Sequence, residues 1–282
     1  KIDFMSGMDN SYKDEIMNYD GSLNKYYENK INMLRGPYLN TEYLAFFMES
    51  EKNEIKSDLI RKAINIGFDK AKMIKYLRNG VGVPANTGFI PIGLPGHRET
   101  NLNKYNPDLA KKYVEEFKKI YNNVPSLKLT TSSNYLDFCE FIQKELEKLG
   151  IEIIIDVIPG SALKQAKASG KLDFFRASWI ADYPDAENYL SLFYSKNFAP
   201  NGPNYTHFSD DDFDKIYERS LKITDPEKSK LIYSELDSII SSKSIIVPLF
   251  YDEVVRFVSK NVKGMEINAT NLLDLRKIKK VN

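Results

Sequence analysis

Carboxylates crowd into one short segment of the chain, directly after the aromatic residue Trp179. They are Asp182, Asp185 and Glu187, and Tyr183 lies among them. Two carboxylates can act as acid and base in glycoside hydrolysis, and several oxygen ligands at short spacing suit Ca²⁺. A third interpretation gives the cluster no binding role and makes it a proline turn capped by an Asp side chain. A fourth is that a fixed carboxylate beside an aromatic ring binds a substrate ammonium group. The residues alone leave these four interpretations open.

Arg176 precedes this cluster on the same predicted strand, in a segment that also contains Phe175 and Trp179. A charge among aromatic residues needs a partner if it is buried. One interpretation is an internal salt bridge to Asp182 or Asp185. The other is that the guanidinium is kept for a ligand carboxylate, which Arg can bind in bidentate fashion.

The chain offers little material for other catalytic or metal chemistry. His97 and His207 are the only imidazoles and lie far apart, and Cys139 is the single Cys, which excludes an internal disulfide and a Cys-based zinc site. Residues 80–85 fit the G-x-G-x-x-[GA] pattern, but a predicted helix precedes them and Pro84 lies within them, so a plain loop is the better interpretation. These residues therefore predict no nucleotide cofactor and no His- or Cys-based metal site.

Composition narrows the possible partners. The 282 residues include 40 Lys plus Arg and 39 Asp plus Glu, for a net charge of +1, so there is no broad basic field for nucleic acid or an anionic membrane surface. With a mean hydropathy of −0.43, no segment approaches the roughly 20 apolar residues of a membrane helix. The sequence opens on Lys1 without an initiator Met, and we expect a trimmed or processed chain.

Strands and helices are predicted to alternate in the middle of the chain. Short connections between them favour an α/β fold with a mostly parallel sheet, and the apolar run 151–157 predicts a strand of the buried type. The predicted elements here are residues 127–131, 134–149, 151–157, 161–169 and 172–179.

The flanking regions are predicted from capping residues and apolar spacing. Ser57, Asp69, Asn106 and Ser209 are expected to begin helices, and residues 80–98 are expected to form a long surface loop. The remaining expected elements are an extended segment at 30–47, helices at 106–121, 211–223 and 226–241, and strands at 244–250 and 254–258.

One segment resembles a known family. Residues 176–185, RASWIADYPD, followed by NYL at 188–190 and LF at 192–193, resemble the signature of the extracytoplasmic oligopeptide and dipeptide binding proteins of ABC importers. Further segments resemble this family's landmarks in the same order, namely residues 37–44, 59–69, 80–91, 202–205 and 246–251.

This resemblance implies a bilobed fold of the type II periplasmic-binding-protein class. Because members of the family are longer, we expect the chain to be a C-terminal portion with one complete lobe and part of the other. Residues 41–250 would form the C-terminal lobe, and residues 1–40 and 251–282 would belong to the N-terminal lobe. The hinge would lie at the two crossings near residues 38–43 and 247–252.

The resemblance also implies a binding mode. In the family an extended peptide lies between the lobes and pairs its backbone with a strand, whose matching residues here are Ala177, Ser178 and Trp179. The family's acidic residue for the peptide α-ammonium matches Asp182, and its strand Arg, which can bind a peptide carboxylate, matches Arg176.

Further site residues follow from the same comparison. Asn134 occupies the place where one well-known member has a carboxylate-binding His, which leaves the preferred peptide length open. Tyr183 supplies the aromatic ring beside Asp182, and Asn204 and Tyr205 match a motif near the site.

We therefore expect a monomeric, non-enzymatic binding protein that captures short peptides and delivers them to an ABC transporter permease. It would act outside the cytoplasm and contact the membrane only through a lipid anchor or the permease, without nucleic acid. The alternatives are the same fold binding a nickel chelate, haem or sugar, and a hydrolase that uses Asp182 together with Asp185 or Glu187.

Overall fold

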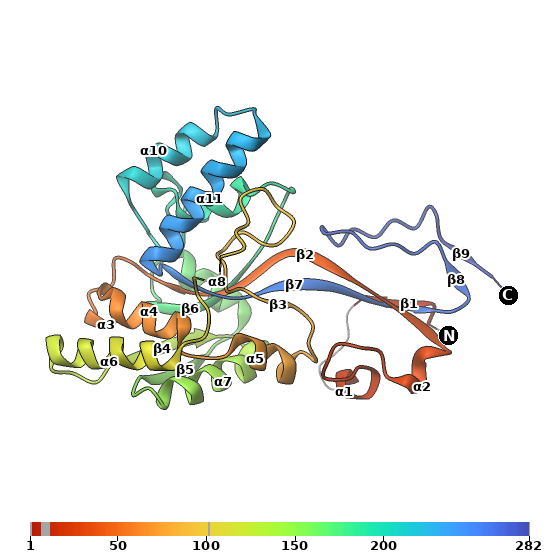
Figure 1. Cartoon of the computed structure of the whole chain (residues 1–282), viewed down its shortest axis with the longest axis horizontal. Helices are drawn as coiled ribbons and strands as arrows, with labels where there is room; N and C mark the ends of the chain where they lie inside the picture. Colours follow the sequence, from red (N-terminus) through yellow and green to blue (C-terminus); the bar gives the residue numbers. More distant parts are fainter. Residues whose placement is uncertain (1, 7–11, 101, 282) are drawn as a thin grey trace.

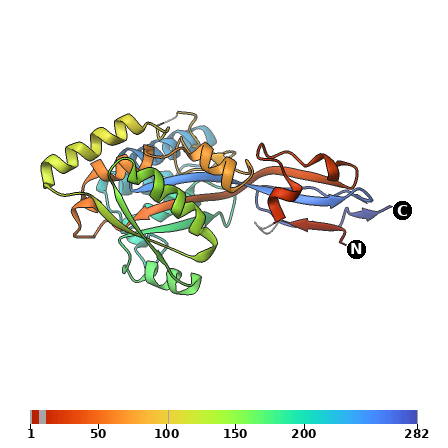
Figure 2. The same cartoon turned by 90° about the horizontal axis from the view of Figure 1, so that it is seen from below.

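Two long strands join a broad body to a narrow extension in the computed structural model, which describes residues 2–6, 12–100 and 102–281 (Figure 1). These strands, β2 (Ile31–Phe46) and β7 (Ile246–Ser259), pair antiparallel. Figure 2 shows the same division at a right angle. The extension also contains β1 (Phe4–Ser6), α1 (Lys13–Ile16), α2 (Lys25–Glu28), β8 (Val262–Lys263) and β9 (Lys279–Lys280).

One mixed sheet runs through both parts. Its strand order is β1, β7, β2, β6, β4, β5, and β3 also pairs with β7. β4 is parallel to β5 and β6, whereas the other pairs are antiparallel. The predicted parallel arrangement is therefore right for β4, β5 and β6 only, because β2 and β7 enter the sheet from distant parts of the chain. The bounds are β3 (Val83–Pro84), β4 (Ser126–Thr131), β5 (Glu152–Val157) and β6 (Phe174–Ile180).

The helices of the body lie close to their predicted positions. None of the helices in the described ranges has the length and apolar character needed to cross a membrane. Their bounds are α3 (Asn53–Lys56), α4 (Asp58–Ile66), α5 (Lys70–Leu77), α6 (Pro107–Tyr121), α7 (Leu136–Glu147), α8 (Gly160–Ala168), α9 (Glu187–Leu190), α10 (Asp211–Ser220) and α11 (Pro226–Lys243).

Capping side chains explain where several helices begin. Asn106 accepts a hydrogen bond from the backbone of α6, and Asp69 does the same for α5, which satisfies N–H groups that have no partner within the helix. Ser57 is the N-cap residue of α4 as predicted, although its side chain makes no cap hydrogen bond. One predicted cap is wrong, because α10 is capped by Asp210 rather than Ser209.

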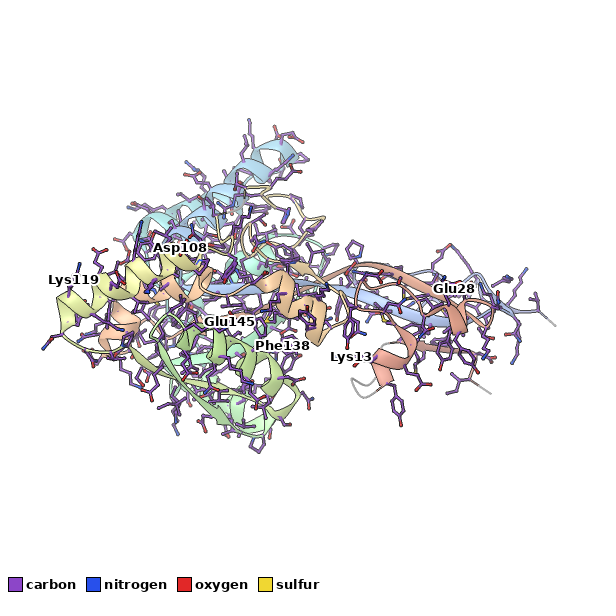
Figure 3. The ribbon with its side chains drawn as sticks, turned by 60° about the horizontal axis from the view of Figure 1, so that its bottom comes forward. Lys13, Glu28, Asp108, Lys119, Phe138 and Glu145 are labelled. Carbon is purple, nitrogen blue, oxygen red and sulfur yellow. The ribbon has the colours of Figure 1, made fainter. Side chains whose placement is uncertain are left out.

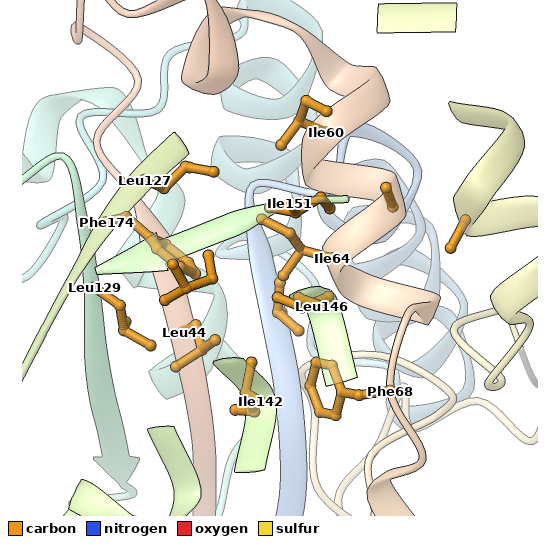
Figure 4. Close-up of a cluster of buried hydrophobic side chains, with 14 of the residues drawn as sticks. Leu44, Ile60, Ile64, Phe68, Leu127, Leu129, Ile142, Leu146, Ile151 and Phe174 are labelled. Carbon is orange, nitrogen blue, oxygen red and sulfur yellow. The ribbon is translucent and has the colours of Figure 1, made fainter. Parts of the chain in front are cut away.

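Hydrophobic side chains cover both faces of the sheet. Alternate residues of a strand point to opposite faces, and on β2 Leu44 and Phe46 join one buried cluster while Tyr43 and Ala45 join the other. The first cluster packs α4, α6 and α7 against the sheet, and Figure 4 shows Ile64 of α4 and Leu146 of α7 within it; the second cluster packs α9, α10 and α11. The covered sheet gives β6 a rigid support.

The loop at residues 80–98 is more deeply packed than predicted. Phe89 and Ile90 are both 0% exposed and belong to the second cluster. The Phe89 N–H donates to Asp237 at 2.8 Å, and its carbonyl accepts from the Thr41 hydroxyl at 3.0 Å. The expectation of a surface loop was wrong because isolated apolar residues anchor the segment without a periodic pattern.

β5 was predicted to be a buried strand and instead lies at the edge of the sheet. It pairs with β4 alone among the described strands. Ile154 and Val157 are 51% and 44% exposed. An apolar run does not reveal how many strands lie beside it, so the sequence could not distinguish the two positions.

Irregular pairing marks the place where β2 and β7 pass from the extension into the body. Their register shifts between Pro37 and Thr41 and again between Glu42 and Tyr43. β7 is one continuous strand where two were predicted, and Pro248 pairs with Tyr43 beside the second shift. A β-bulge bends a strand and increases its twist. These shifts fall within the predicted hinge segment 38–43, whose role as a hinge stays a prediction.

Candidate functional site

The candidate site is built on a free edge of β6. β2 pairs with β6 over its whole length, whereas β4 pairs with only its first residues, up to Phe175. No described strand pairs with this edge beyond that point. The Ala181 N–H donates to the Leu39 carbonyl at 2.9 Å, so the alternation of an antiparallel pair directs the N–H and C=O groups of Ser178 and Ile180 to the free edge. Such an edge can accept an extended backbone.

Of the residues predicted to pair with a ligand backbone, Ser178 directs its N–H and C=O to the free edge, whereas the same alternation turns those of Ala177 and Trp179 toward β2, so backbone pairing by these two residues is contradicted. Ala177 is buried, and Ser178 and Trp179 are half-buried. The Trp179 indole N–H donates to Asn188 Oδ1 at 2.8 Å, which fixes the orientation of the ring beside the strand. Contact of these residues with a ligand stays a prediction.

Asn188 also holds the backbone that carries Asp182. Its Oδ1 accepts a second hydrogen bond from the Asp182 N–H at 3.2 Å, and Asn188 itself is only 5% exposed. The Asp182 carboxylate is exposed and makes no hydrogen bond or ion pair with any residue that the structure describes. Asn188 was not among the predicted site residues, although a polar residue immediately before the apolar pair Tyr189 and Leu190 is a signal that the sequence offers.

The other carboxylates of the cluster are used within the fold. Asp185 Oδ1 accepts from the Glu187 N–H at 2.8 Å, so the interpretation as a capped turn is confirmed for this residue. The Glu187 carboxylate accepts hydrogen bonds from the hydroxyls of Tyr183 and Tyr217. Burial and Glu187 raise the pKa of the Tyr217 phenol. The described residues contain no group of His, Cys, Asp and Glu that could hold a metal ion, so the calcium interpretation has no support.

Arg176 is buried and forms an ion pair with Glu42 of β2. The predicted internal partners, Asp182 and Asp185, are wrong, because the pair instead joins neighbouring strands on the sheet face that α7 covers. The Arg176 guanidinium carbon lies 3.1 Å from the centre of the Tyr135 ring. A ligand carboxylate that reached Arg176 would compete with Glu42.

A network of polar contacts connects this ion pair to the crossing strands β2 and β7. Asn40 Nδ2 lies 3.2 Å from Glu42 Oε1 and 3.2 Å from Asp252 Oδ2, and it donates to both. Asp252 in turn pairs with Arg78. Burial raises the pKa of Glu42, while Arg176 and Asn40 act in the opposite direction. The network therefore ties β6 to β2 and β7 where the body meets the extension.

A cleft of about 390 Å³ lies beside this network. Its walls include Asn134 and Tyr135 from the turn that precedes α7, Phe138 from the first turn of α7, and Lys13 from the extension. Figure 3 shows Phe138 at the end of the body that faces the extension and Lys13 across from it. Asn134, a predicted ligand residue, is exposed in this wall.

Asn204 and Tyr205 differ in how they are placed. Asn204 is 0% exposed, and its Nδ2 donates to the carbonyls of Tyr194 and Phe208 at 3.1 and 3.0 Å. Its amide is therefore used to hold its own loop, which gives it a structural role. The Tyr205 ring is half-buried and lies 5.3 Å from the ammonium nitrogen of Lys167.

A known family matches most of the chain. Residues 2–201 match the model of the family described as "Bacterial extracellular solute-binding proteins, family 5 Middle". A relative from Escherichia coli K12, the probable D,D-dipeptide-binding periplasmic protein DdpA, is 24% identical over 244 residues, which cover 86% of this chain and 46% of the relative. The glutathione-binding protein GsiB of the same strain is 25% identical over 246 residues, covering 84% and 47%.

Solved structures share the fold. The periplasmic binding protein DppA from Helicobacter pylori, in complex with the peptide STSA, matches with a TM-score of 0.82 and 22% identity, covering 100% of this chain and 53% of that one. AppA from Bacillus subtilis, in complex with a nonapeptide, matches with a TM-score of 0.79 and 18% identity, covering 100% and 56%. The predicted type II periplasmic-binding-protein fold is confirmed. The chain spans about half the length of the relatives that it matches.

Proposed function

Because the chain belongs to the bacterial extracellular solute-binding proteins of family 5, we propose that it forms part of a binding protein that captures short peptides for an ABC transporter. The observation that carries this proposal is the free edge of β6 next to the unpartnered carboxylate of Asp182. A peptide in extended form offers both a backbone for the edge and an ammonium group for the carboxylate.

This arrangement favours binding that does not depend on peptide sequence. Backbone pairing along Ser178 and Ile180 would use groups that every peptide has. A hydrogen bond between the α-ammonium and Asp182 would contribute about 1.5–3 kcal/mol, as hydrogen bonds to charged groups do. Asn188 supports this role because it fixes the backbone of Asp182 and the ring of Trp179 with the same oxygen.

We assign the body, residues 41–250, to one lobe, and residues 1–40 and 251–282 to part of a second lobe. The peptide would lie between them, near the cleft at the crossing strands. The binding protein would act outside the cytoplasm and would deliver the bound peptide to a membrane permease. The full-length protein would be a lipid-anchored monomer without catalytic activity. Relatives named as periplasmic binding proteins support this location.

Two alternatives remain as outcomes for experiment. The same fold can bind a different small ligand, such as a nickel chelate, haem or a sugar, since architecture does not fix the ligand. A hydrolase that uses Asp182 with Asp185 or Glu187 is less well supported, because Glu187 is held by two phenols and Asp185 caps a turn.

The test measures calorimetric affinity of the full-length gene product for a mixed set of di- to pentapeptides, each with a free or an acetylated N-terminus. In the Asp182→Asn variant, affinity for free-amine peptides should fall about tenfold to a hundredfold, because a charged hydrogen bond is lost. Acetylated peptides should bind the variant and the parent equally. Asp108→Asn is the matched control, because Asp108 is exposed on α6 (Figure 3). Equal losses for both peptide classes, or no loss, would overturn the assignment, and hydrolysis of the peptide that stops in Asp182→Asn would favour the hydrolase.

A further inference from the structure

The C-terminal segment returns from the extension to the place where β6 ends. Residues 265–272, which we call the strap, lie between β8 and β9, and Figure 1 shows this part of the chain reaching from the extension toward the body. Within the strap, the Ala269 carbonyl accepts a hydrogen bond from the Leu39 N–H of β2 at 2.8 Å. Ala269 also packs against the second hydrophobic cluster, so the strap touches the body directly.

The strap accepts a hydrogen bond that a longer β6 would accept. Leu39 and Ala181 stand opposite each other, one pair beyond the end of the β2–β6 ladder. Opposed residues of this kind exchange two hydrogen bonds in a regular antiparallel ladder. Here the Ala181 N–H donates to the Leu39 carbonyl at 2.9 Å, whereas the Leu39 N–H donates to Ala269. The regular ladder therefore stops at this pair, and the next residue along the chain is Asp182.

A buried guanidinium anchors the strap to the extension. Arg256 of β7 is 1% exposed. Its Nη1 donates to the Glu266 carbonyl at 2.9 Å, and its Nη2 donates to the side-chain and main-chain oxygens of Asn271 at 3.0 and 3.2 Å. A buried charge needs hydrogen-bond partners to offset its lost hydration. These partners are uncharged groups of the strap, so the burial of Arg256 and the position of the strap depend on each other.

The strap is also held in shape by one of its own side chains. Asn268 Oδ1 accepts from the Leu272 N–H at 3.0 Å, and Asn268 Nδ2 donates to the Leu272 carbonyl at 2.8 Å. The Asn271 N–H donates to the Asn268 carbonyl at 3.0 Å. These bonds close residues 268–272 into a compact turn, which fixes Ala269 relative to the groups that Arg256 holds.

The backbone that carries the Asp182 carboxylate is therefore fixed from two directions. Asn188 accepts from the Asp182 N–H, and Leu39 accepts from the N–H of the preceding residue, Ala181. Leu39 itself lies in the first interruption of the β2–β7 ladder, where β7 pairs with β2 only on either side of it. The Ala269 carbonyl supplies the partner for the Leu39 N–H at this irregular place.

We propose that the strap positions the Asp182 carboxylate for the ammonium group of a bound peptide, and that Arg256 is the positioning residue that holds the strap. This inference rests on the proposed peptide-binding function. The path runs from Arg256 through the strap to Leu39, and from Leu39 to Ala181 and Asp182. Since Arg256 belongs to the extension and Asp182 to the body, recognition of the ammonium group depends on both parts of the molecule.

The experiment measures calorimetric affinities of the full-length gene product for matched tetrapeptides with a free or an acetylated N-terminus. Arg256→Lys keeps the charge but loses the planar fork that reaches several acceptors at once. It should weaken binding of free-amine peptides by about twofold to thirtyfold, as changes along a coupling network do, and leave acetylated peptides unaffected. Arg276→Lys is the matched control, because the Arg276 side chain is 88% exposed and lies outside the strap. In the Asp182→Asn background, Arg256→Lys should have no further effect on either class of peptide.

The outcomes separate this inference from the function on which it rests. Equal losses for both peptide classes in Arg256→Lys, or no loss, would overturn the role of the strap and leave the proposed function standing. A full loss that persists in the Asp182→Asn background would do the same, because the strap would then act on another part of the site. If Asp182→Asn alone leaves free-amine peptides unaffected, both proposals fail. Asn268→Ala changes an exposed residue and should give the same selective loss; if Arg256→Lys does not fold, an unselective result in Asn268→Ala overturns the inference.

Discussion

The buried pair of Glu42 and Arg176 gives a quantitative prediction about the support of the site. Glu42 is 3% exposed and Arg176 is 8% exposed, so replacing either one leaves the other as a buried charge without its partner. Breaking a buried ion pair in this way costs about 3–5 kcal/mol. We therefore expect Glu42→Gln and Arg176→Met each to lower the free energy of unfolding by about this amount.

The double variant distinguishes coupling from two independent effects. Because neither charge remains, its free energy of unfolding should lie closer to that of the parent than either single variant does. Urea unfolding of the 282-residue chain can be followed by the fluorescence of Trp179, which is the single Trp in the sequence and lies on the same strand.

Additive losses in the double variant would refute this reasoning. They would mean that Glu42 and Arg176 are not coupled in solution. The guanidinium would then be available to a ligand carboxylate, as the family resemblance implies for Arg176. A large coupling energy would instead assign Arg176 to holding β6 against β2.

Three further predictions concern stability and positioning. Burial lowers the pKa of Lys70 from 10.5 to about 7, so between these pH values the unfolded chain binds a proton that the folded chain does not. The free energy of unfolding, measured by urea unfolding, should therefore rise from pH 7 to pH 9 by up to about 1.4 kcal/mol per pH unit. An equal slope in the Lys70→Met variant would contradict this prediction. Asn188→Ala should cost about 1–3 kcal/mol, because it leaves the indole N–H of the half-buried Trp179 without its acceptor. Calorimetry should also show weaker binding of free-amine peptides, and unchanged stability and affinity would remove Asn188 from the site. Gly88→Ala should lower Tm, because a Cβ there would lie 1.9 Å from a carboxylate oxygen of Asp237; a Tm equal to that of the parent would show that the loop can shift without cost.

The elements that the sequence predicted best are those with local signals. Asn106 followed by Pro107 placed the start of α6, and Asp69 placed that of α5, because a cap and its helix are neighbours in the chain. The alternation of strands and helices from β4 to β6 was also recognised. The position of β6 was therefore predictable, and so was the segment that carries Asp182.

Features that depend on contacts between distant residues could not be predicted. Glu42 is far from Arg176 in the sequence, and only the antiparallel register of β2 and β6 brings them together. The exposure of Ile154 depends on the absence of a further described strand beside β5. The free edge of β6 arises in the same way, because it exists where β4 stops pairing.

The ladder between β2 and β7 bears on how the extension could move relative to the body. Paired strands resist sliding and in-plane bending, since either would break several hydrogen bonds together. Both interruptions of the ladder fall between Pro37 and Tyr43. We therefore expect any bending between the extension and the body to occur at this segment, in a direction set by the twist of the two paired strands rather than by the length of a linker.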